Sequence, residues 1–259
     1  MTLNDEMKAH ERQTRSYLTP KTYTVIRLDG KAFHTYTKGM QKPYDQTFMD
    51  NMDQVAATLC KEVFNTKFAY VQSDEISLIV ADWDPARPFA DTQAYFGGQI
   101  QKITSVSSAV AAATLNFLSP PEDISGLAYF DSRVFNLPTF EDVESYVIWR
   151  MRDARKNSIS MAAYAKFSSK SLIDKSSTDR LALLEQAGSP WEKLPQGFRH
   201  GRVITRETFT EPVTYLNKRS GESHTVDAVR SRWTATPAPD FQGPEGRAYL
   251  RSLIPQKLV

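Results

Sequence analysis

Acidic side chains stand at two predicted strand ends in the first third of the chain. Asp29 directly follows the β-branched and aromatic run 22–28, and Asp74 and Glu75 lie inside the stretch 68–80, between two short apolar runs. Acids that converge repel one another unless cations hold them, and Mg²⁺ prefers hard oxygen ligands. If the fold brings these three acids together, they are typical of a magnesium site.

The elements around these acids predict how they meet. Hydrophobic spacing indicates five elements in the order strand, helix, hairpin, helix, strand, at residues 22–28, 46–64, 68–80, 99–115 and 129–135. This order is the α+β, ferredoxin-like split βαβ arrangement, an antiparallel sheet with both helices on one face. The first strand then runs beside the hairpin, so the three acids converge on one edge. Each motif alone is more often a strand-end turn or a polar hairpin tip; together they favour a metal site.

Such a site would have a defined chemistry. Two Mg²⁺ ions roughly 3.5–4 Å apart would lower the pKa of an attacking hydroxyl group and neutralise leaving phosphates. This is the palm arrangement of nucleotide polymerases and cyclases. We therefore predict a palm-type catalytic core over residues 1–140.

Residues 141–259 are predicted to form a basic helical and β extension. The near-neutral total of +2 hides a net charge of −3 in residues 1–130 and of +5 in residues 131–259. Cations concentrate at Arg150, Arg152, Arg155 and Lys156. On this feature alone, a phosphate-binding face and a solvated helix surface are about equally well supported. Residues 202–232 are typical of strands and turns, and 234–246 of an irregular tail.

The composition excludes several classes of protein. The single cysteine, Cys60, forms no internal disulfide or multi-cysteine zinc site, which favours a reducing, cytoplasmic setting. No apolar run is long enough to span a bilayer, so no membrane partner is expected.

Residues after the first acid are suited to a nucleoside triphosphate. Gly30 permits close approach of the backbone to a ligand, and residues 31–34 would cover phosphates with amide groups and one cation. Lys42 and Lys102 are further candidates for phosphate oxygens, with solvated surface lysines as the alternative.

Five sequence strings together resemble the tRNA-His guanylyltransferase family, in its smaller bacterial-type branch. They are RLDGKAFH at 27–34, KPYD at 42–45, QSDEIS at 72–77, KITSVSS at 102–108 and FDSRV at 130–134. The resemblance covers residues 5 to 170 well and 191–203 more weakly.

The resemblance implies a polymerase-like palm that adds nucleotides to the 5′ end of tRNA in the 3′-to-5′ direction. It implies two Mg²⁺ ions held by Asp29, Gly30 and Asp74, with Glu75 supporting them, GTP and ATP as substrates, and a homotetramer. It also implies that the extension over 141–259 contacts tRNA and other subunits. The expected catalytic residues are Asp29, Asp74 and Glu75. The expected nucleotide-binding residues are Asp29, Gly30, Lys31, Ala32, Phe33, His34, Lys42, Ser73, Asp74, Lys102, Arg133 and Asn157, and the expected tRNA-binding residues are Arg150, Arg152, Arg155 and Lys156.

One departure from the family pattern bears on the substrate. Eukaryotic members carry His-Ile-Asn-Asn-Leu-Tyr-Asn after a Trp-Arg pair, and here only Asn157 is retained after Trp149 and Arg150. This favours templated repair of tRNA 5′ ends over strict G addition to tRNA-His. The alternatives are a palm-type nucleotidyl cyclase, which would act on GTP alone, and a non-catalytic RNA-binding module, which would display aromatic residues on its sheet in place of the acids.

Overall fold

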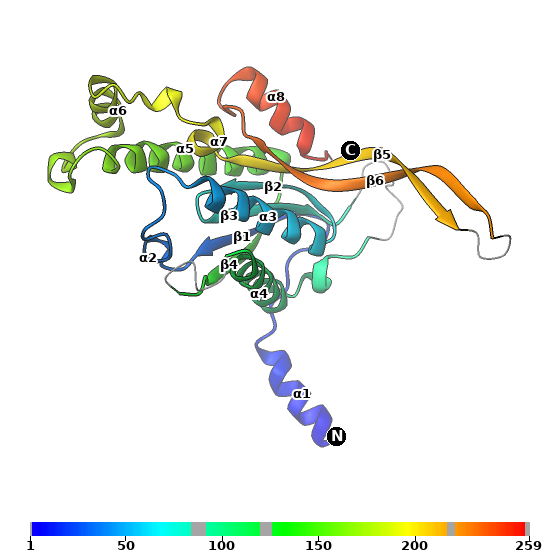
Figure 1. The fold of residues 1–259 in the computed structure, drawn as a ribbon. Helices are drawn as coiled ribbons and strands as arrows, with labels where there is room; N and C mark the ends of the chain where they lie inside the picture. The colour runs from blue at the N-terminus through cyan, green and yellow to red at the C-terminus, as the bar shows by residue number, and fades with distance from the viewer. Residues whose placement is uncertain (1, 84–91, 120–125, 217–220, 257–259) are drawn as a thin grey trace.

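The computed structural model describes residues 2–83, 92–119, 126–216 and 221–256. Figure 1 shows its central sheet, the helices packed on the two faces of that sheet, and two projections from the body. The strands are β1 (Tyr23–Gly30), β2 (Thr66–Gln72), β3 (Glu75–Ala81), β4 (Phe130–Leu137), β5 (Arg202–Leu216) and β6 (Ser223–Pro237). The α-helices are α1 (Leu3–Gln13), α2 (Phe33–Tyr36), α3 (Gln46–Glu62), α4 (Ile100–Leu118), α5 (Phe140–Tyr164), α6 (Ser177–Gln186), α7 (Gln196–His200) and α8 (Pro244–Leu253).

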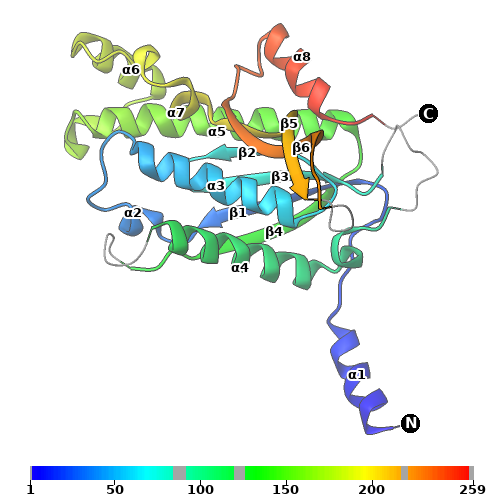
Figure 2. The same cartoon turned by 45° about the vertical axis from the view of Figure 1, so that its right-hand side comes forward.

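The described strands form one antiparallel sheet in the order β4-β1-β3-β2-β5-β6. Strands β1 to β4 with α3 and α4 make up the split βαβ unit, and both helices pack on the same face, as Figure 2 shows. The predicted α+β, ferredoxin-like fold is confirmed. Strand β5 pairs with β2, so one sheet runs through both of the predicted parts, 1–140 and 141–259.

The face covered by α3 and α4 is apolar. Ile26 and Leu28 of β1 are at most 1% exposed, and they belong to one cluster with Met52 and Leu59 of α3 and Leu115 of α4. Alternation along β1 places these side chains on this face and leaves the residues between them to the other. The face therefore anchors the strands that carry the site.

The opposite face is covered by α5 and α8. Val25 and Ile79 of the sheet pack with Met151 of α5 and Leu250 of α8 in a second cluster. The buried carboxylate of Glu144 in α5 binds two arginines of α8, Arg247 at 3.3 Å and Arg251 at 3.0 Å. Helix α5 is thus held against the sheet by apolar packing and by α8.

Three details differ from the sequence predictions. The hairpin tip has two residues, Ser73 and Asp74, because Glu75 already pairs with Gln72. The predicted irregular tail 234–246 instead contains the end of β6 and the start of α8.

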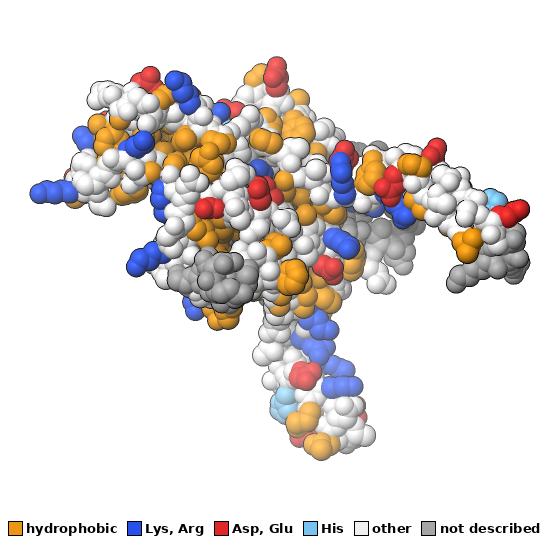
Figure 3. Space-filling view, viewed as in Figure 1, with side chains coloured by type: hydrophobic (Ala, Val, Ile, Leu, Met, Phe, Trp, Pro, Cys, Tyr) orange, Lys and Arg blue, Asp and Glu red, His pale blue; other side chains and the backbone are white. Residues whose placement is uncertain are grey.

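The third difference is a pair of projections. Strand β5 pairs with β2 only up to Thr205, and beyond it β5 and β6 pair with each other, so they extend past the sheet as an arm. Helix α1 buries none of its residues and projects separately from the arm, at the bottom of the view in Figure 1 and Figure 3.

Candidate functional site

The sheet register gathers acids at one end of β1. Asp29 pairs with Glu75 of β3 on one side and with Asp131 of β4 on the other, and paired residues share a face of the sheet. One step along the same face, Arg27 pairs with Arg133. A row of acids therefore lies beside a row of arginines, on the face that α5 covers.

Asp74 lies at the hairpin turn beside this row. Its backbone carbonyl accepts a hydrogen bond from the amide of Gly30 at 3.2 Å, which ties the turn to the end of β1. Ser73 adopts a left-handed conformation with φ of 46° in the same turn. Burial raises the pKa of Asp74 to about 6, and the nearby charges of Asp29 and Glu75 add to this shift. Asp29 and Asp74 are thus brought together, as the sequence predicts.

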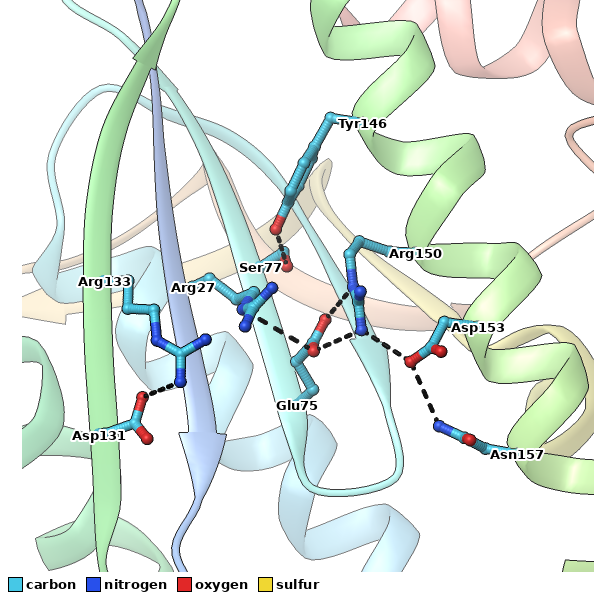
Figure 4. Close-up of polar contacts among 9 residues, drawn as sticks. All are labelled: Arg27, Glu75, Ser77, Asp131, Arg133, Tyr146, Arg150, Asp153 and Asn157. Atoms are coloured by element: carbon cyan, nitrogen blue, oxygen red, sulfur yellow. Dashed lines mark hydrogen bonds and ion pairs between the residues drawn. The ribbon is translucent and has the colours of Figure 1, made fainter. Parts of the chain in front are cut away.

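The Glu75 carboxylate is held by arginines (Figure 4). Arg150 of α5 donates from Nε to Oε1 and from Nη2 to Oε2, both at 2.7 Å, and Arg27 Nε lies 3.9 Å from Oε2. Burial raises the pKa of Glu75, and the Arg150 and Arg27 guanidinium groups oppose that shift. Glu75 therefore joins α5 to the acid row and has both oxygens engaged.

This contact corrects one sequence-based assignment. The Arg150 side chain is 7% exposed and faces the sheet, with Glu75 and Asp153 as its partners. Its helix position turns it inward, so it does not reach a tRNA backbone, whereas Arg152 and Lys156 are exposed. The prediction treated the basic segment as one face, although residues two apart on a helix point in different directions.

A chain of polar contacts continues from Arg150 along α5. Arg150 Nη2 lies 2.8 Å from Asp153 Oδ2, and Asn157 Nδ2 donates to the same oxygen at 3.3 Å. The hydroxyl groups of Tyr146 and Ser77 hydrogen-bond at 2.7 Å on the same face. Asn157 is thus linked to Arg150 through Asp153.

Two adjoining cavities open beside the Ser73–Asp74 turn. The first, of about 310 Å³, has a largely apolar wall that includes Phe48 and Phe198, and the second, of about 430 Å³, is bordered by charged groups that include Arg27 and Asp29. The two cavities share five lining residues, which are Gln72, Ser73, Asp74, Asn157 and Met161. An apolar cavity that joins a polar one can accept a ligand with a flat apolar part and a charged part.

Gly30 is required by close packing behind the first cavity. A Cβ atom at Gly30 would overlap the ring of Phe33, which is buried against Phe48 and Phe130. Ala32 begins α2 in a left-handed conformation, with φ of 56°. Phe33 therefore forms part of the cavity wall and of the core.

The other predicted nucleotide-binding residues differ from one another in their surroundings. His34 and Lys42 line the first cavity. The amide of Lys31 donates to the Tyr129 carbonyl at 2.8 Å, so it is already engaged. Arg133 is exposed and lies 3.5 Å from Asp131.

Lys102 is not brought to these cavities. It lies near the start of α4, whereas Asn116, 14 residues later, binds Ala128 close to the end of β1 that carries the acids. Ser107, five residues after Lys102, hydrogen-bonds Ser132 at 2.9 Å, and Ser132 pairs with Leu28. At about 1.5 Å per residue, Lys102 therefore lies about 8 Å along the helix from the level of Leu28. Helix α4 also covers the opposite face of the sheet from Asp29. The sequence string around Lys102 is confirmed as helix, but nothing in that string shows which end of the helix meets the site.

Sequence reasoning missed several residues of the site. Arg27, Gln72 and Asp153 line the second cavity, and Asp131 completes the acid row. Alternation from Asp29 places Arg27 on the same face, so that residue was open to prediction. The others depend on strand register and on the position of α5.

The described residues hold no group of three or more His, Cys, Asp or Glu side chains arranged to bind a metal ion. The carboxylates of Asp29 and Asp74, which line the second cavity, are oxygen donors of the kind that a hard cation prefers, and Gly30 directly follows Asp29. Glu75 is engaged by arginines and is not one of these donors.

Comparisons with known proteins are consistent with this geometry. A family model described as tRNAHis guanylyltransferase matches residues 4–138. A bacterial tRNA(His) guanylyltransferase-like protein, solved in complex with ATP, is 32% identical with a TM-score of 0.80, and the match covers 98% of this chain and 99% of that one. The structure of such a bacterial protein in complex with GTP matches with a TM-score of 0.77 and 32% identity, over 97% of this chain and 98% of that one. The tRNA(His) guanylyltransferase of Saccharomyces cerevisiae is 26% identical over 215 residues, 75% of this chain and 87% of that protein.

None of the helices in the described part of the chain combines the length and apolarity needed to cross a membrane.

Proposed function

The chain belongs to the tRNAHis guanylyltransferase family of nucleotidyltransferases, and on that premise we propose that it adds nucleotides to the 5′ end of tRNA in the 3′-to-5′ direction with Mg²⁺. The reaction is templated 5′-end repair, G addition to tRNA-His, or both. The observation that carries this proposal is the convergence of Asp29 and Asp74 where the apolar and the charged cavity meet.

The donor set suits two Mg²⁺ ions. Asp29 and Asp74 supply carboxylates and Gly30 a carbonyl. Burial raises the pKa of Asp74 to about 6, and a cation bound beside it would favour the ionised carboxylate. Bound there, Mg²⁺ supplies positive charge that offsets the phosphates and favours ionisation of a ribose hydroxyl group.

The two adjoining cavities suit different parts of a nucleoside triphosphate. The apolar wall with Phe48 and Phe198 suits a flat base, and Lys42 at its rim suits phosphate oxygens. GTP and ATP are the proposed ligands because the bacterial structural relatives hold them. The residues proposed to contact the nucleotide are Asp29, Gly30, Lys31, Ala32, Phe33, His34, Lys42, Ser73, Asp74, Arg133 and Asn157.

The chemistry proceeds on an activated 5′ end. The 3′-hydroxyl group of the incoming nucleotide attacks a 5′ phosphate that is a triphosphate or has been adenylylated with ATP, and pyrophosphate or AMP leaves. The protein itself would contribute by positioning the reacting groups and by neutralising their negative charge. Arg150 holds Glu75, and so holds α5 with Asn157 against the hairpin that carries Asp74.

We also propose the branch of the family, the oligomeric state and the cellular compartment of the protein. Near-complete coverage by bacterial structures supports the bacterial-type branch. A homotetramer would cover exposed apolar side chains such as Leu216 and Val229 on the arm. The arm belongs to the extension over 141–259, which we propose also contacts tRNA. A tRNA substrate and a single buried cysteine suit the cytoplasm.

The decisive experiment supplies 5′-truncated tRNAs with each nucleoside triphosphate in turn, with Mg²⁺ or with EDTA. We expect addition only with Mg²⁺, and the added nucleotide to follow the base on the opposite strand. Changing that opposing base is the matched control and should change the nucleotide added. G addition regardless of the opposing base would contradict templated repair. A cyclic product from GTP alone, without use of tRNA, would contradict the proposal as a whole.

A further inference from the structure

Two arginines outside the acid row share one aromatic ring. The guanidinium carbon of Arg155 in α5 lies 5.1 Å from the centre of the Trp191 ring, and that of Arg199 in α7 lies 5.0 Å from it. Both distances are within the range of cation–π attraction. We call Arg155 and Arg199 the arginine pair.

The ring that carries the arginine pair is fixed in place. Trp191 is 3% exposed, and its Nε1 donates to Ser158 Oγ at 3.1 Å. Arg199 Nε donates to the Leu194 carbonyl at 2.9 Å. The remaining guanidinium donors are therefore held in position before any ligand arrives, which lowers the entropic cost of binding.

The arginine pair lacks the acidic partners that other arginines have. Arg150, Arg202 and Arg251 each bind a carboxylate. Within the described ranges, neither Arg155 nor Arg199 has a carboxylate within ion-pair distance. Two guanidinium groups on one ring repel each other, so an anion placed between or beside them is stabilised.

His200 lies next to the arginine pair, with its ring 5.6 Å from that of Trp191. Burial lowers its pKa first, the charges of Arg199 and Arg155 lower it further, and only Asp240 opposes them. Two exposed cations of α5, Arg152 and Lys156, extend the positive surface, and Figure 3 shows blue side chains over the α5 and α6 side of the molecule.

The position of the arginine pair relates it to the site. Ser158, which lines the first cavity, accepts the hydrogen bond from Trp191 Nε1 at 3.1 Å, so the ring that carries the arginine pair contacts a residue of the cavity wall. A series of cations that leads along one helix toward a nucleotide cavity fits a chain of phosphates better than a single small anion.

We propose that Arg155 and Arg199, held on Trp191, bind phosphodiester groups of the tRNA backbone next to its 5′ end. This inference rests on the proposed function, because it takes tRNA as the substrate. The planar guanidinium fork suits phosphate oxygens, and contacts to the backbone position the RNA without reading its sequence.

The test measures binding of a 5′-truncated tRNA by fluorescence anisotropy over a range of salt concentrations. We expect Arg199→Gln to weaken tRNA binding about 5- to 10-fold at 0.1 M salt and to reduce the salt slope by about 1. The double variant Arg155→Gln, Arg199→Gln should reduce the slope by about 2. GTP affinity should stay unchanged.

Arg230→Gln is the matched control, because it removes one positive charge from the exposed arm, where Arg230 pairs with Glu211 at 3.2 Å. It should bind tRNA more tightly than Arg199→Gln does. Equal weakening by the control would overturn the inference, because total charge alone would then explain the loss.

A purely structural role for the arginine pair gives a different result. If Arg199→Gln lowers the melting temperature but leaves the tRNA affinity and salt slope unchanged, the inference is wrong. Should that variant fold poorly, Arg199→Lys keeps the charge and should keep the salt slope; loss of the slope would refute the inference. Failure of the wild-type protein to bind or extend tRNA would refute the proposed function as well. Extension by the wild type with unaffected binding by the variants would refute this inference alone.

Discussion

The two faces of the sheet differ although the same strands form both. On the face under α3 and α4, Ile26 and Leu28 are buried in an apolar cluster. On the face under α5, their neighbours Arg27 and Asp29 belong to rows of charge, and Glu75 binds Arg150. The alternation of a β-strand separates the two environments by a single residue.

This difference shows how the molecule separates stability from chemistry. The apolar face fixes the strands, so the carboxylates on the other face hold their places despite mutual repulsion. Charge compensation comes from α5, which follows the split βαβ unit in the chain. The comparison predicts that neighbouring substitutions on β1 have effects of different kinds.

The largest contrast is expected between Asp29 and Leu28. Asp29→Asn should reduce nucleotide addition by at least about 1000-fold, because it removes charge next to the reacting phosphates, and should leave folding intact. Leu28→Ala should cost about 2–5 kcal/mol of unfolding free energy through a cavity in the core. Addition assays and urea unfolding of both variants test this. Full activity in Asp29→Asn would remove Asp29 from the catalytic residues.

The second prediction concerns the buried ion pair between Glu75 and Arg150 on the charged face. Arg150→Met should lower the free energy of unfolding by about 3–5 kcal/mol, because it leaves the buried Glu75 charge without its main partner. The double variant Glu75→Gln, Arg150→Met should recover much of that loss in urea unfolding, yet stay impaired in nucleotide addition. If the double variant is as unstable as Arg150→Met, the pair does not act as a unit.

The third prediction concerns pH. The folded protein binds the Asp74 proton more tightly than the unfolded chain does, since the pKa rises from 3.8 to about 6. Ionisation of Asp74 therefore lowers stability progressively as pH rises from about 4 through 6, by on the order of 1–2 kcal/mol. In EDTA, Asp74→Asn should be more stable than wild type at pH 8, and the difference should shrink toward pH 4.

The activity should depend on pH in the opposite direction to the stability. Addition should fall as pH drops below about 6, because protonated Asp74 is a poor ligand for a cation. A wild type that is more stable than Asp74→Asn at pH 8 without metal would contradict the raised pKa.

The smallest effect is expected at Tyr146, whose hydroxyl group bonds Ser77 at 2.7 Å. Tyr146→Phe should cost about 1 kcal/mol of unfolding free energy, because it removes one buried hydrogen bond and keeps the ring packing. Urea unfolding measures this, with Ser77→Ala as the control for the same bond. An effect as large as that of Arg150→Met would indicate that the hydroxyl group belongs to the charge network.

Most of the fold was open to prediction because it follows from local patterns. The periods of apolar residues gave β1, α3 and α4 within a few residues, and the element order gave the split βαβ unit. The length of the β5–β6 arm was not predictable, because the exposed residues of a long hairpin carry little periodic signal.

The candidate site was predictable in part. Asp29 and Asp74 could be placed together, because the element order sets which strands are neighbours. The pairing of Glu75 with Arg150 could not be foreseen, because no local pattern gives the rotation of α5 against the sheet. Lys102 lines neither cavity, because α4 packs on the other face of the sheet.

The sequence by itself determined which residues alternate on each strand, where the acids fall and to which family the chain belongs. Those properties are local or are carried by short strings such as residues 27–34 and 72–77. Only the tertiary structure decided which charges meet, because partners such as Glu75 and Arg150, 75 residues apart, are joined by register and helix packing. It also decided which cations remain without acidic partners within the described residues, and so placed the arginine pair on Trp191.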